Sequence, residues 1–217
     1  MVDAILFGSI GVLAETSEIQ RQAFNQSFKE HGLDWYWNIA NYCELLKSPG
    51  GKRRIKDFST VNLSDAIVES IHTRKENIFF DQLKLGHHPR EGVMDCIKIC
   101  RDKNIKIGFV TTTSHNNVDA IKQALHEYID FTLFDLITTK TDVSNEKPSG
   151  DIYKFALTKL EVSLENTIAI EDTEVNQQAA LENEILCYLF AGEYASTQRN
   201  FNAIKTLKTI SSKLETL

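Results

Sequence analysis

The sequence has no long hydrophobic run and no excess of positive charge. None of its apolar runs approaches the roughly 18 residues that a membrane-spanning helix needs. Its 24 Lys and Arg residues are outnumbered by 30 Asp and Glu residues, and the net charge of -6 argues against a general nucleic-acid or anionic-membrane binder. The N-terminus also lacks the basic segment and apolar core of a leader peptide. We therefore expect a cytoplasmic protein.

Cysteine pairs of the metal-binding or redox type are also missing. The chain has 4 cysteines, at positions 43, 96, 100 and 187, and none of them forms a Cys-x-x-Cys pair. Cys96 and Cys100 lie about one helical turn apart among apolar neighbours, so we expect both to be small buried hydrophobes on a helix. The cysteines therefore predict neither a disulfide nor a metal site.

A short apolar run near the N-terminus leads straight into a glycine-flanked turn. Residues 4–7 are Ala-Ile-Leu-Phe, and the turn that follows runs from Gly8 to Gly11. In α/β proteins, a buried parallel strand often ends in a loop that forms part of the functional site. We therefore expect residues 4–7 to form the first strand and residues 8–11 to line a site.

From about residue 16 to residue 86, the pattern predicts only helices. Ser17 and Gln20 have the spacing of a capping box, and the helix that they would start ends at Gly32. Ser64 is placed to cap a longer helix, which ends before Gly86. This segment therefore looks like an all-helical unit.

After residue 87, the pattern changes to strands that alternate with helices. Further apolar segments of strand character lie at residues 105–110, 136–138, 167–170 and 185–190. This alternation predicts an α/β fold with a doubly wound parallel sheet. We expect an α/β core formed by residues 1–15 and 87–217, with a helical cap domain of residues 16–86 inserted into it.

Polar side chains follow several of the predicted strands at the point where each strand ends. They are the loop 8–11, the turn 111–114, Lys147, and the pair Glu171-Asp172. In a doubly wound sheet these segments converge at one crevice, where hydroxyl, lysine and carboxylate groups suit a phosphoryl group and a Mg²⁺ ion. Taken singly, each also fits a bland role, as a turn residue, a solvated lysine or helix N-terminal acids.

A basic turn in the predicted cap is a second candidate for anion binding. Lys52 and Arg54 follow the pair Gly50-Gly51. Two cations beside free backbone amides form an anion site of a common kind. The alternative is a basic turn that is merely solvated.

Together these segments resemble the haloacid dehalogenase (HAD) superfamily of hydrolases, which have a Rossmann-like core, in the subclass with a helical cap. Gly11 and Leu13 match the first motif, and the turn 111–114, Lys147 and the pair 171–172 match the later ones in order. Within the superfamily, the chain is most similar to CbbY-type sugar-bisphosphate phosphatases. That similarity is carried in the cap by Arg21-Gln22-Ala23-Phe24-Asn25, Gly32-Leu33-Asp34-Trp35 and Gly50-Gly51-Lys52, and in the core by Thr111-Thr112-Thr113-Ser114 and Asp151-Ile152-Tyr153.

The resemblance implies a role for each matched residue of the core. Thr111 would hydrogen-bond the transferring phosphoryl group, with help from Thr112, and Lys147 would neutralise its charge. Asp172, with Glu171 beside it, would hold Mg²⁺.

The resemblance also implies a ligand. In the cap, Lys52 and Arg54 would bind a second, distal phosphate or the hydroxyl groups of a sugar. The ligand would therefore be a phosphorylated small molecule, a sugar phosphate or bisphosphate, rather than a nucleic acid or a membrane.

The chain departs from the family at the centre of the first motif. In the family, one aspartate attacks phosphorus and a second serves as acid and base, but Gly8 and Ile10 stand at these two positions. Neither side chain can perform either step. The loss of a carboxylate also weakens the Mg²⁺ site, so we expect little Mg²⁺ without a phosphate ligand. We further expect Lys147 to form a direct ion pair with Asp172.

These departures favour a catalytically impaired phosphatase homologue, a pseudoenzyme that acts by binding a sugar phosphate. The second hypothesis is an active hydrolase with a non-standard nucleophile. Ser9 is a weak candidate for that role, because in an extended strand end it points away from the face of residues 8 and 10. The third hypothesis is a scaffold that binds a protein partner.

Overall fold

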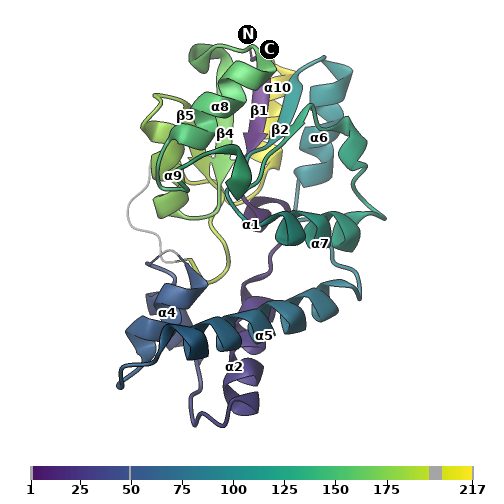
Figure 1. Cartoon of the computed structure of the whole chain (residues 1–217). Helices are drawn as coiled ribbons and strands as arrows, with labels where there is room; N and C mark the ends of the chain where they lie inside the picture. Colours follow the sequence, from purple (N-terminus) through teal and green to yellow (C-terminus); the bar gives the residue numbers. More distant parts are fainter. Residues whose placement is uncertain (1, 49, 196–201, 217) are drawn as a thin grey trace.

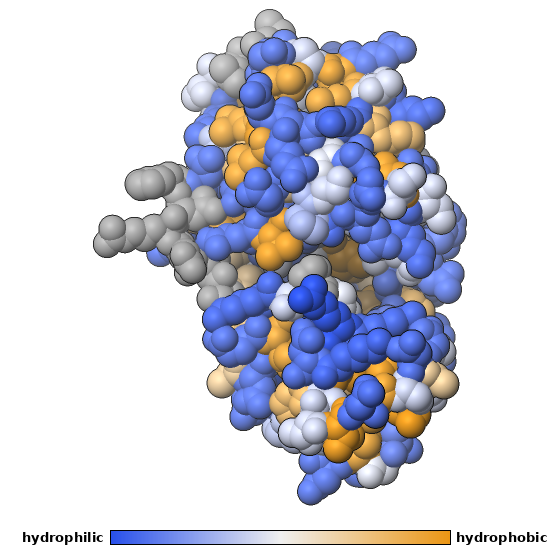
Figure 2. Space-filling view, turned by 60° about the vertical axis from the view of Figure 1, so that its left-hand side comes forward, coloured by the Kyte–Doolittle hydropathy of each residue, from blue (hydrophilic) through white to orange (hydrophobic). Residues whose placement is uncertain are grey.

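The computed structural model describes residues 2–48, 50–195 and 202–216. Two parts can be followed in Figure 1, a sheet with helices on both faces at the top and a group of helices below it. Figure 2 shows the same two parts as lobes that meet at a narrower waist, under a largely hydrophilic surface. The expectation of an α/β fold is confirmed. The division at residues 16 and 86 into core and cap domains stays a prediction.

A parallel sheet with strand order β3-β2-β1-β4-β5 forms the centre of the upper part. The strands are β1 (Ala4–Phe7), β2 (Lys106–Phe109), β3 (Leu136–Ile137), β4 (Thr167–Glu171) and β5 (Leu186–Leu189). Phe7 at the end of β1 is in register with Phe109 of β2 and with Ile170 of β4. The residues that follow these three strands therefore come together at one edge of the sheet.

Side chains of β1 alternate between two hydrophobic layers, one on each face of the sheet. Ile5 and Phe7 face the layer that contains α6 (Val93–Asp102), α7 (His115–Leu125) and α10 (Lys208–Glu215). Ala4 and Leu6 face the other layer, which contains α8 (Asp151–Leu160) and α9 (Glu174–Leu181). Helices thus cover both faces, as the doubly wound pattern predicts.

The cysteines take the structural places that their apolar neighbours suggest. Cys96 and Cys100 are fully buried on α6, and Cys187 is buried in β5. All four, including the partly buried Cys43, are free thiols.

The lower part, which we call the helical unit, consists of α2 to α5. These helices are α2 (Ser17–Glu30), α3 (Ile39–Leu45), α4 (Gly51–Phe58) and α5 (Asp65–Leu83). Their core is aromatic: the buried Trp37 ring lies 4.5 Å from that of Phe24 and 4.8 Å from that of Phe28, measured between ring centres. Aromatic pairs at such distances add to the stability gained from burial alone.

Two predictions for the helical unit are decided by its caps. Ser64 caps α5 as expected, with its hydroxyl accepting a hydrogen bond from the Ile67 amide. The predicted capping box of Ser17 with Gln20 is wrong. The amide of Ser17 instead donates to Oε1 of Glu15 at 2.8 Å, so a carboxylate before the helix satisfies its N-terminus.

Hydrogen bonds join the helical unit to the sheet part beside the first loop. Oε2 of Glu15 accepts from the amide of Glu193 at 2.6 Å, and the hydroxyl of Tyr194 donates to Glu18 at 2.8 Å. Glu193 and Tyr194 follow β5, so these contacts link the sheet edge to the start of α2. A second contact is apolar, where Phe79 of α5 packs near Ala124 of α7. No helix in the described part of the chain has the length and apolarity needed to cross a bilayer.

Replacement of Gly92 by alanine should destabilise the fold more than the same change at Gly86. Both residues have positive φ, +84° and +89°, so alanine should cost about 1–2 kcal/mol at either site through backbone strain. At Gly92, the new Cβ would also lie 2.5 Å from the amide nitrogen of Lys208, whereas at Gly86 no described residue other than the chain neighbours lies within 4 Å. That clash should add about 1–3 kcal/mol, and urea unfolding measures the difference. Equal losses at the two sites would contradict this packing.

Acid should weaken the contact between Glu18 and Arg21. Hydrogen bonds from Arg21 are the largest cause that lowers the pKa of Glu18 from its ordinary value of 4.5 to about 2. A depressed carboxylate pKa stabilises the folded state above pH 4.5, and that stabilisation is lost as pH falls towards 2. Glu18 is 43% exposed, so the loss should be at most about 1 kcal/mol.

Unfolding free energies of the wild type and of Glu18→Gln, measured between pH 6 and pH 2, test this expectation. The gap between the two proteins should narrow as pH falls through this window. A gap that stays constant would contradict the role of the Glu18 carboxylate.

Candidate functional site

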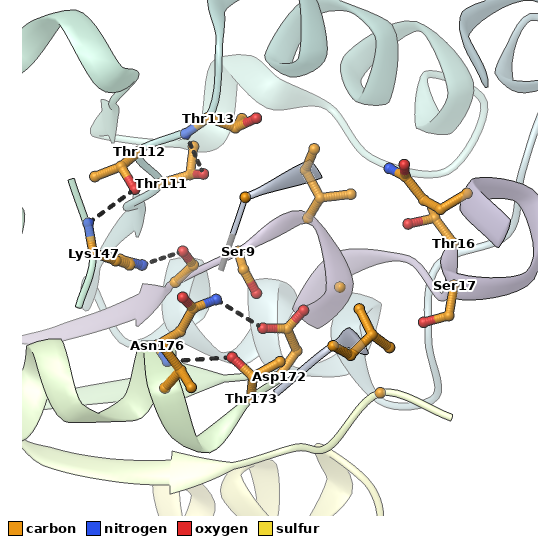
Figure 3. A pocket seen from close by; sticks show the side chains of 18 of the residues that line it. Ser9, Thr16, Ser17, Thr111, Thr112, Thr113, Lys147, Asp172, Thr173 and Asn176 are labelled. Carbon is orange, nitrogen blue, oxygen red and sulfur yellow. Dashed lines mark hydrogen bonds between the residues drawn. The ribbon is translucent and has the colours of Figure 1, made fainter. Parts of the chain in front are cut away.

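A cavity of about 350 Å³ lies between the sheet edge and the helical unit. Its sheet end is formed by residues 8–11 after β1, the turn 111–113 after β2, Lys147, and Asp172 with its neighbours after β4. The predicted turn 8–11, which we continue to call the loop 8–11, is in part helical, because Ile10 and Gly11 begin the short helix α1 (Ile10–Leu13). Its helix end is formed by Tyr42, Leu46, Gly50 and Arg54, with Glu15 to Ser17 between the two ends. Figure 3 shows the sheet end, where Thr111, Thr112, Lys147 and Asp172 surround Ser9. The volume lies within the range of small-molecule sites, about 300–1,000 Å³.

Lys147 is the buried cation at the sheet end. Its Nζ donates to the backbone oxygens of Gly8 and Val110, the latter at 2.7 Å, and to Oε1 of Glu171. An ammonium group has three protons, and these acceptors use all of them. Lys147 is therefore both neutralised and saturated by the protein itself.

The Glu171 carboxyl group occupies the space above Gly8. A Cβ atom at position 8 would overlap this carboxyl group and would lie 2.5 Å from the hydroxyl oxygen of Tyr153. Glu171 is fully buried, and its Oε1 accepts from the Tyr153 hydroxyl at 2.7 Å as well as from Lys147. The missing side chain at position 8 thus leaves room for a buried ion pair.

The surroundings of Glu171 change its protonation chemistry. Burial raises the pKa of Glu171 above its usual range, and the ammonium group of Lys147 opposes that shift. Burial also raises the pKa of Tyr153 well above its usual value. The second carboxyl oxygen of Glu171, Oε2, is buried without a hydrogen-bond partner among the described residues.

The expected ion pair between Lys147 and Asp172 is wrong, because the partner of Lys147 is Glu171. Asp172 is turned to the other side of the loop, against the backbone of Gly11, where a Cβ atom would overlap its carboxylate. Its Oδ1 accepts a hydrogen bond of 3.2 Å from the side-chain amide of Asn176, which Figure 3 shows. The two neighbouring carboxylates therefore have different partners, Lys147 for Glu171 and Asn176 for Asp172.

The threonine turn supplies neutral hydrogen-bond donors. The hydroxyl oxygen of Thr111 accepts from the amide of Thr113 at 3.2 Å, and that of Thr112 accepts from the amide of Lys147 at 3.3 Å. Neither hydroxyl proton is donated to an acceptor among the described residues, so both remain available for a ligand. The amide of Thr111 is held by the buried hydroxyl of Thr138, which fixes the turn.

Ser9 lies in the loop between the two positions where the family has aspartates. Its backbone is extended, as expected, but the side chain lines the cavity rather than facing away from it. Its hydroxyl is buried and has no hydrogen-bond partner in the part of the chain that the structure describes. Figure 3 shows the hydroxyl pointing towards Asp172 and Asn176.

Arg90 fixes the position of the loop 8–11 through hydrogen bonds to backbone oxygens. Its guanidinium group donates to the backbone oxygens of Gly11 at 2.7 Å, Phe190 at 2.8 Å and Ala191 at 2.6 Å. It also stacks on the ring of Phe190. These bonds join the loops that follow β1 and β5.

The helix end places the two predicted cap cations on different sides. Residues 51–58 form the helix α4, not a turn, and residues two positions apart on a helix do not share a face. Arg54 lines the cavity, and its Nε donates to the backbone oxygens of Leu45 and Ser48, both at 3.1 Å. Lys52 points outward to Glu69, 2.5 Å away, and is about half exposed.

The residues present do not fit a carboxylate-rich metal site. Among the described residues, no group of three His, Cys, Asp or Glu side chains is placed to hold a metal ion. Glu171 is committed to Lys147, which leaves Asp172 as the acidic ligand at the loop 8–11. Magnesium is usually held by one or two carboxylates together with substrate phosphate, and Asp172 supplies a single carboxylate at this loop among the described residues; the chemistry derived below therefore uses no metal step.

Residues that the sequence did not assign to the site complete it. Tyr153 appears in the sequence only within the matching segment 151–153, and Arg90 and Tyr42 were given no role there. For Tyr153 a signal existed, because a polar hydroxyl lies among apolar residues on the buried face of α8. Glu15, by contrast, lies in the sequence where it could approach the site as an acid or base from the segment before the helical unit, and it lines the cavity.

These features define a doubly wound α/β protein with a polar cavity at one edge of its sheet, and comparison with known families identifies its class. The family model described as haloacid dehalogenase-like hydrolase matches residues 5–189, and the chain belongs to this family. The five-stranded parallel sheet with its flanking helices is the fold that the sequence predicts.

Within the family, the chain is similar to CbbY proteins, as the sequence motifs predict. CbbY from Cereibacter sphaeroides is 36% identical over 198 residues, which cover 89% of this chain and 86% of that protein. CbbY from Rhodobacter capsulatus is 32% identical over 196 residues, which cover 88% of this chain and 86% of that protein. A crystal structure of a CbbY mutant from Rhodobacter sphaeroides in complex with xylulose-(1,5)bisphosphate has a TM-score of 0.84 and 33% identity, and covers 95% of each chain.

A double-mutant cycle tests the contact between position 8 and Glu171. Gly8→Ala should reduce the free energy of unfolding by about 2 kcal/mol, because the new methyl group displaces a buried carboxyl group. In the background of Glu171→Ala the same change should cost about 1 kcal/mol less, since the carboxyl group is gone. Urea unfolding of the four proteins measures the coupling, and an equal cost in both backgrounds would rule the contact out.

Proposed function

We propose that this chain binds a phosphorylated sugar in the cavity without carrying out aspartyl-phosphate chemistry. The family membership and the similarity to CbbY support a sugar-phosphate ligand. The phosphatase activity of the fold would then have been reduced to binding. The protein would act as a sensor or regulator.

The observation that carries this proposal is the glycine at position 8, where the family has its nucleophilic aspartate. A nucleophile for phosphorus must face the ligand with a free lone pair. Gly8 offers no side chain, and the carboxyl group in its space belongs to Glu171, which is fully buried and bonded to Lys147 and Tyr153. Ile10, at the second position, cannot transfer a proton.

The donors that remain around the cavity suit a phosphorylated sugar. Thr111 and Thr112 offer hydroxyl protons at the sheet end, and Arg54 offers a guanidinium group at the helix end. Arginine is well matched to phosphate because its fork of donors can bind two oxygens at once. The related CbbY structures contain xylulose-(1,5)bisphosphate and phosphate, which supports a ligand of this class.

Binding without turnover is the expected result for sugar phosphates. In isothermal titration calorimetry, xylulose 5-phosphate or xylulose 1,5-bisphosphate should bind with a Kd below about 1 mM. In the presence of Mg²⁺, neither compound should release inorganic phosphate above the level given by the Asp172→Ala variant.

Two outcomes would contradict the proposal. The absence of binding by both compounds would remove the phosphorylated-sugar ligand. Phosphate release that Asp172→Ala abolishes would show an active hydrolase with a different nucleophile.

A further inference from the structure

The positive charge of the cavity lies at its helix end, while its sheet end has no free cation among the described residues. From this asymmetry we infer that the chain selects a sugar with a single phosphate, which Arg54 binds at the helix end. The hydroxyl groups of the sugar then face the sheet end. This inference rests on the proposed function, and it names the substrate class and its orientation.

The sheet end is closed to a phosphate group by the saturation of Lys147. All three ammonium protons have acceptors within the protein, and Glu171 cancels the positive charge. A phosphate at this end would have to displace the Glu171 carboxylate, which is fully buried and also bonded to Tyr153. Separating a buried ion pair leaves a charge without compensation, which is costly.

Carboxylates make the sheet end less favourable still for a second phosphate. Asp172 and Glu146 both line the cavity, and Asp172 lies against the loop 8–11. The negative charges of these carboxylates would repel a phosphate placed beside them, and the repulsion is stronger where water is partly excluded. A bisphosphate would therefore bring one of its phosphates to an end of the cavity that carries net negative charge.

The helix end offers the opposite environment. The Nε of Arg54 donates to two backbone oxygens, whereas the terminal nitrogens of the guanidinium group make no hydrogen bond or ion pair with a described residue; Asp172 and Tyr42 act on Arg54 only through longer-range charge interactions. Arg54 therefore presents a fixed guanidinium edge to the cavity that it lines. Gly50, the N-cap residue that precedes α4 and supplies no side-chain cap, lines the cavity beside Arg54, so the helix N-terminus adds to the attraction of an anion.

The neutral groups at the sheet end match the rest of a sugar. Thr111 and Thr112 each keep a hydroxyl proton, and Ser9, which lines the cavity, has a buried hydroxyl without a hydrogen-bond partner among the described residues. A buried polar atom without a partner is unfavourable unless a ligand or water completes it. Alternating donors and acceptors of this kind suit sugar hydroxyl groups, and Asp172 can accept from them.

Calorimetry with a pair of ligands that differ by one phosphate tests this selection. In buffer without Mg²⁺, xylulose 5-phosphate should bind about tenfold more tightly than xylulose 1,5-bisphosphate, on the scale expected for one unfavourable charged contact. Arg54→Met should weaken binding of the monophosphate by about tenfold or more. Arg53→Met, the same change on the exposed side of α4, is the matched control and should leave binding unchanged.

The variant Glu171→Gln should increase the affinity for the bisphosphate, a result that non-specific attraction of anions to the protein would not produce. Removal of the carboxylate charge frees Lys147, so the affinity for the bisphosphate should rise by about tenfold relative to that for the monophosphate. Circular dichroism establishes that each variant is folded. If Glu171→Gln does not fold, the wild-type comparison and the Arg54/Arg53 pair still decide the inference.

The possible results separate this inference from the proposed function. Tighter binding of the bisphosphate by the wild type, or equal effects of Arg54→Met and Arg53→Met, would overturn the selection while the proposed function stands. Failure of both compounds to bind would overturn the proposed function, and the inference with it.

Discussion

The buried ion pair of Lys147 and Glu171 is the interaction on which the rest of the site depends. It fills the space above Gly8, uses every proton of the lysine and takes support from the Tyr153 hydroxyl. A buried pair of this kind is disrupted at high cost when one partner is lost. The ion pair therefore requires glycine at position 8, because a side chain there would displace the carboxyl group.

The order of the strands brings these groups together. β1 lies between β2 and β4, so Gly8 and Val110, which directly follow β1 and β2, come together at one edge with Glu171, the last residue of β4. The helical unit closes the cavity from the other side, and contacts of Glu15 and Glu18 with the segment after β5 hold it there. The cavity thus has one end built from strand termini and one from α4, and its charge differs between them.

Much of the fold and part of the site could be predicted from the sequence. Apolar runs that alternate with amphipathic segments specify a parallel sheet, and strand ends converge in such a sheet. The sequence could therefore predict that Thr111, Lys147 and Asp172 lie close together. It could not predict which acid pairs with Lys147, because the choice between Glu171 and Asp172 depends on the space that Gly8 leaves. The direction of Lys52 was also missed, because a basic segment assigned as a turn is a helix, whose phase sends Lys52 to Glu69.

Catalysis and binding make different demands on this kind of site. A phosphatase needs an accessible carboxylate beside a free cation, whereas a binding protein needs only complementary donors and charge. The central claim here is that the sheet end has lost its free cation to Glu171. A crystal structure of the protein soaked with inorganic phosphate tests it most directly. The account predicts phosphate at Arg54, with Glu171 still bonded to Lys147; phosphate bound by Lys147 and Thr111, with Glu171 turned away, would contradict it.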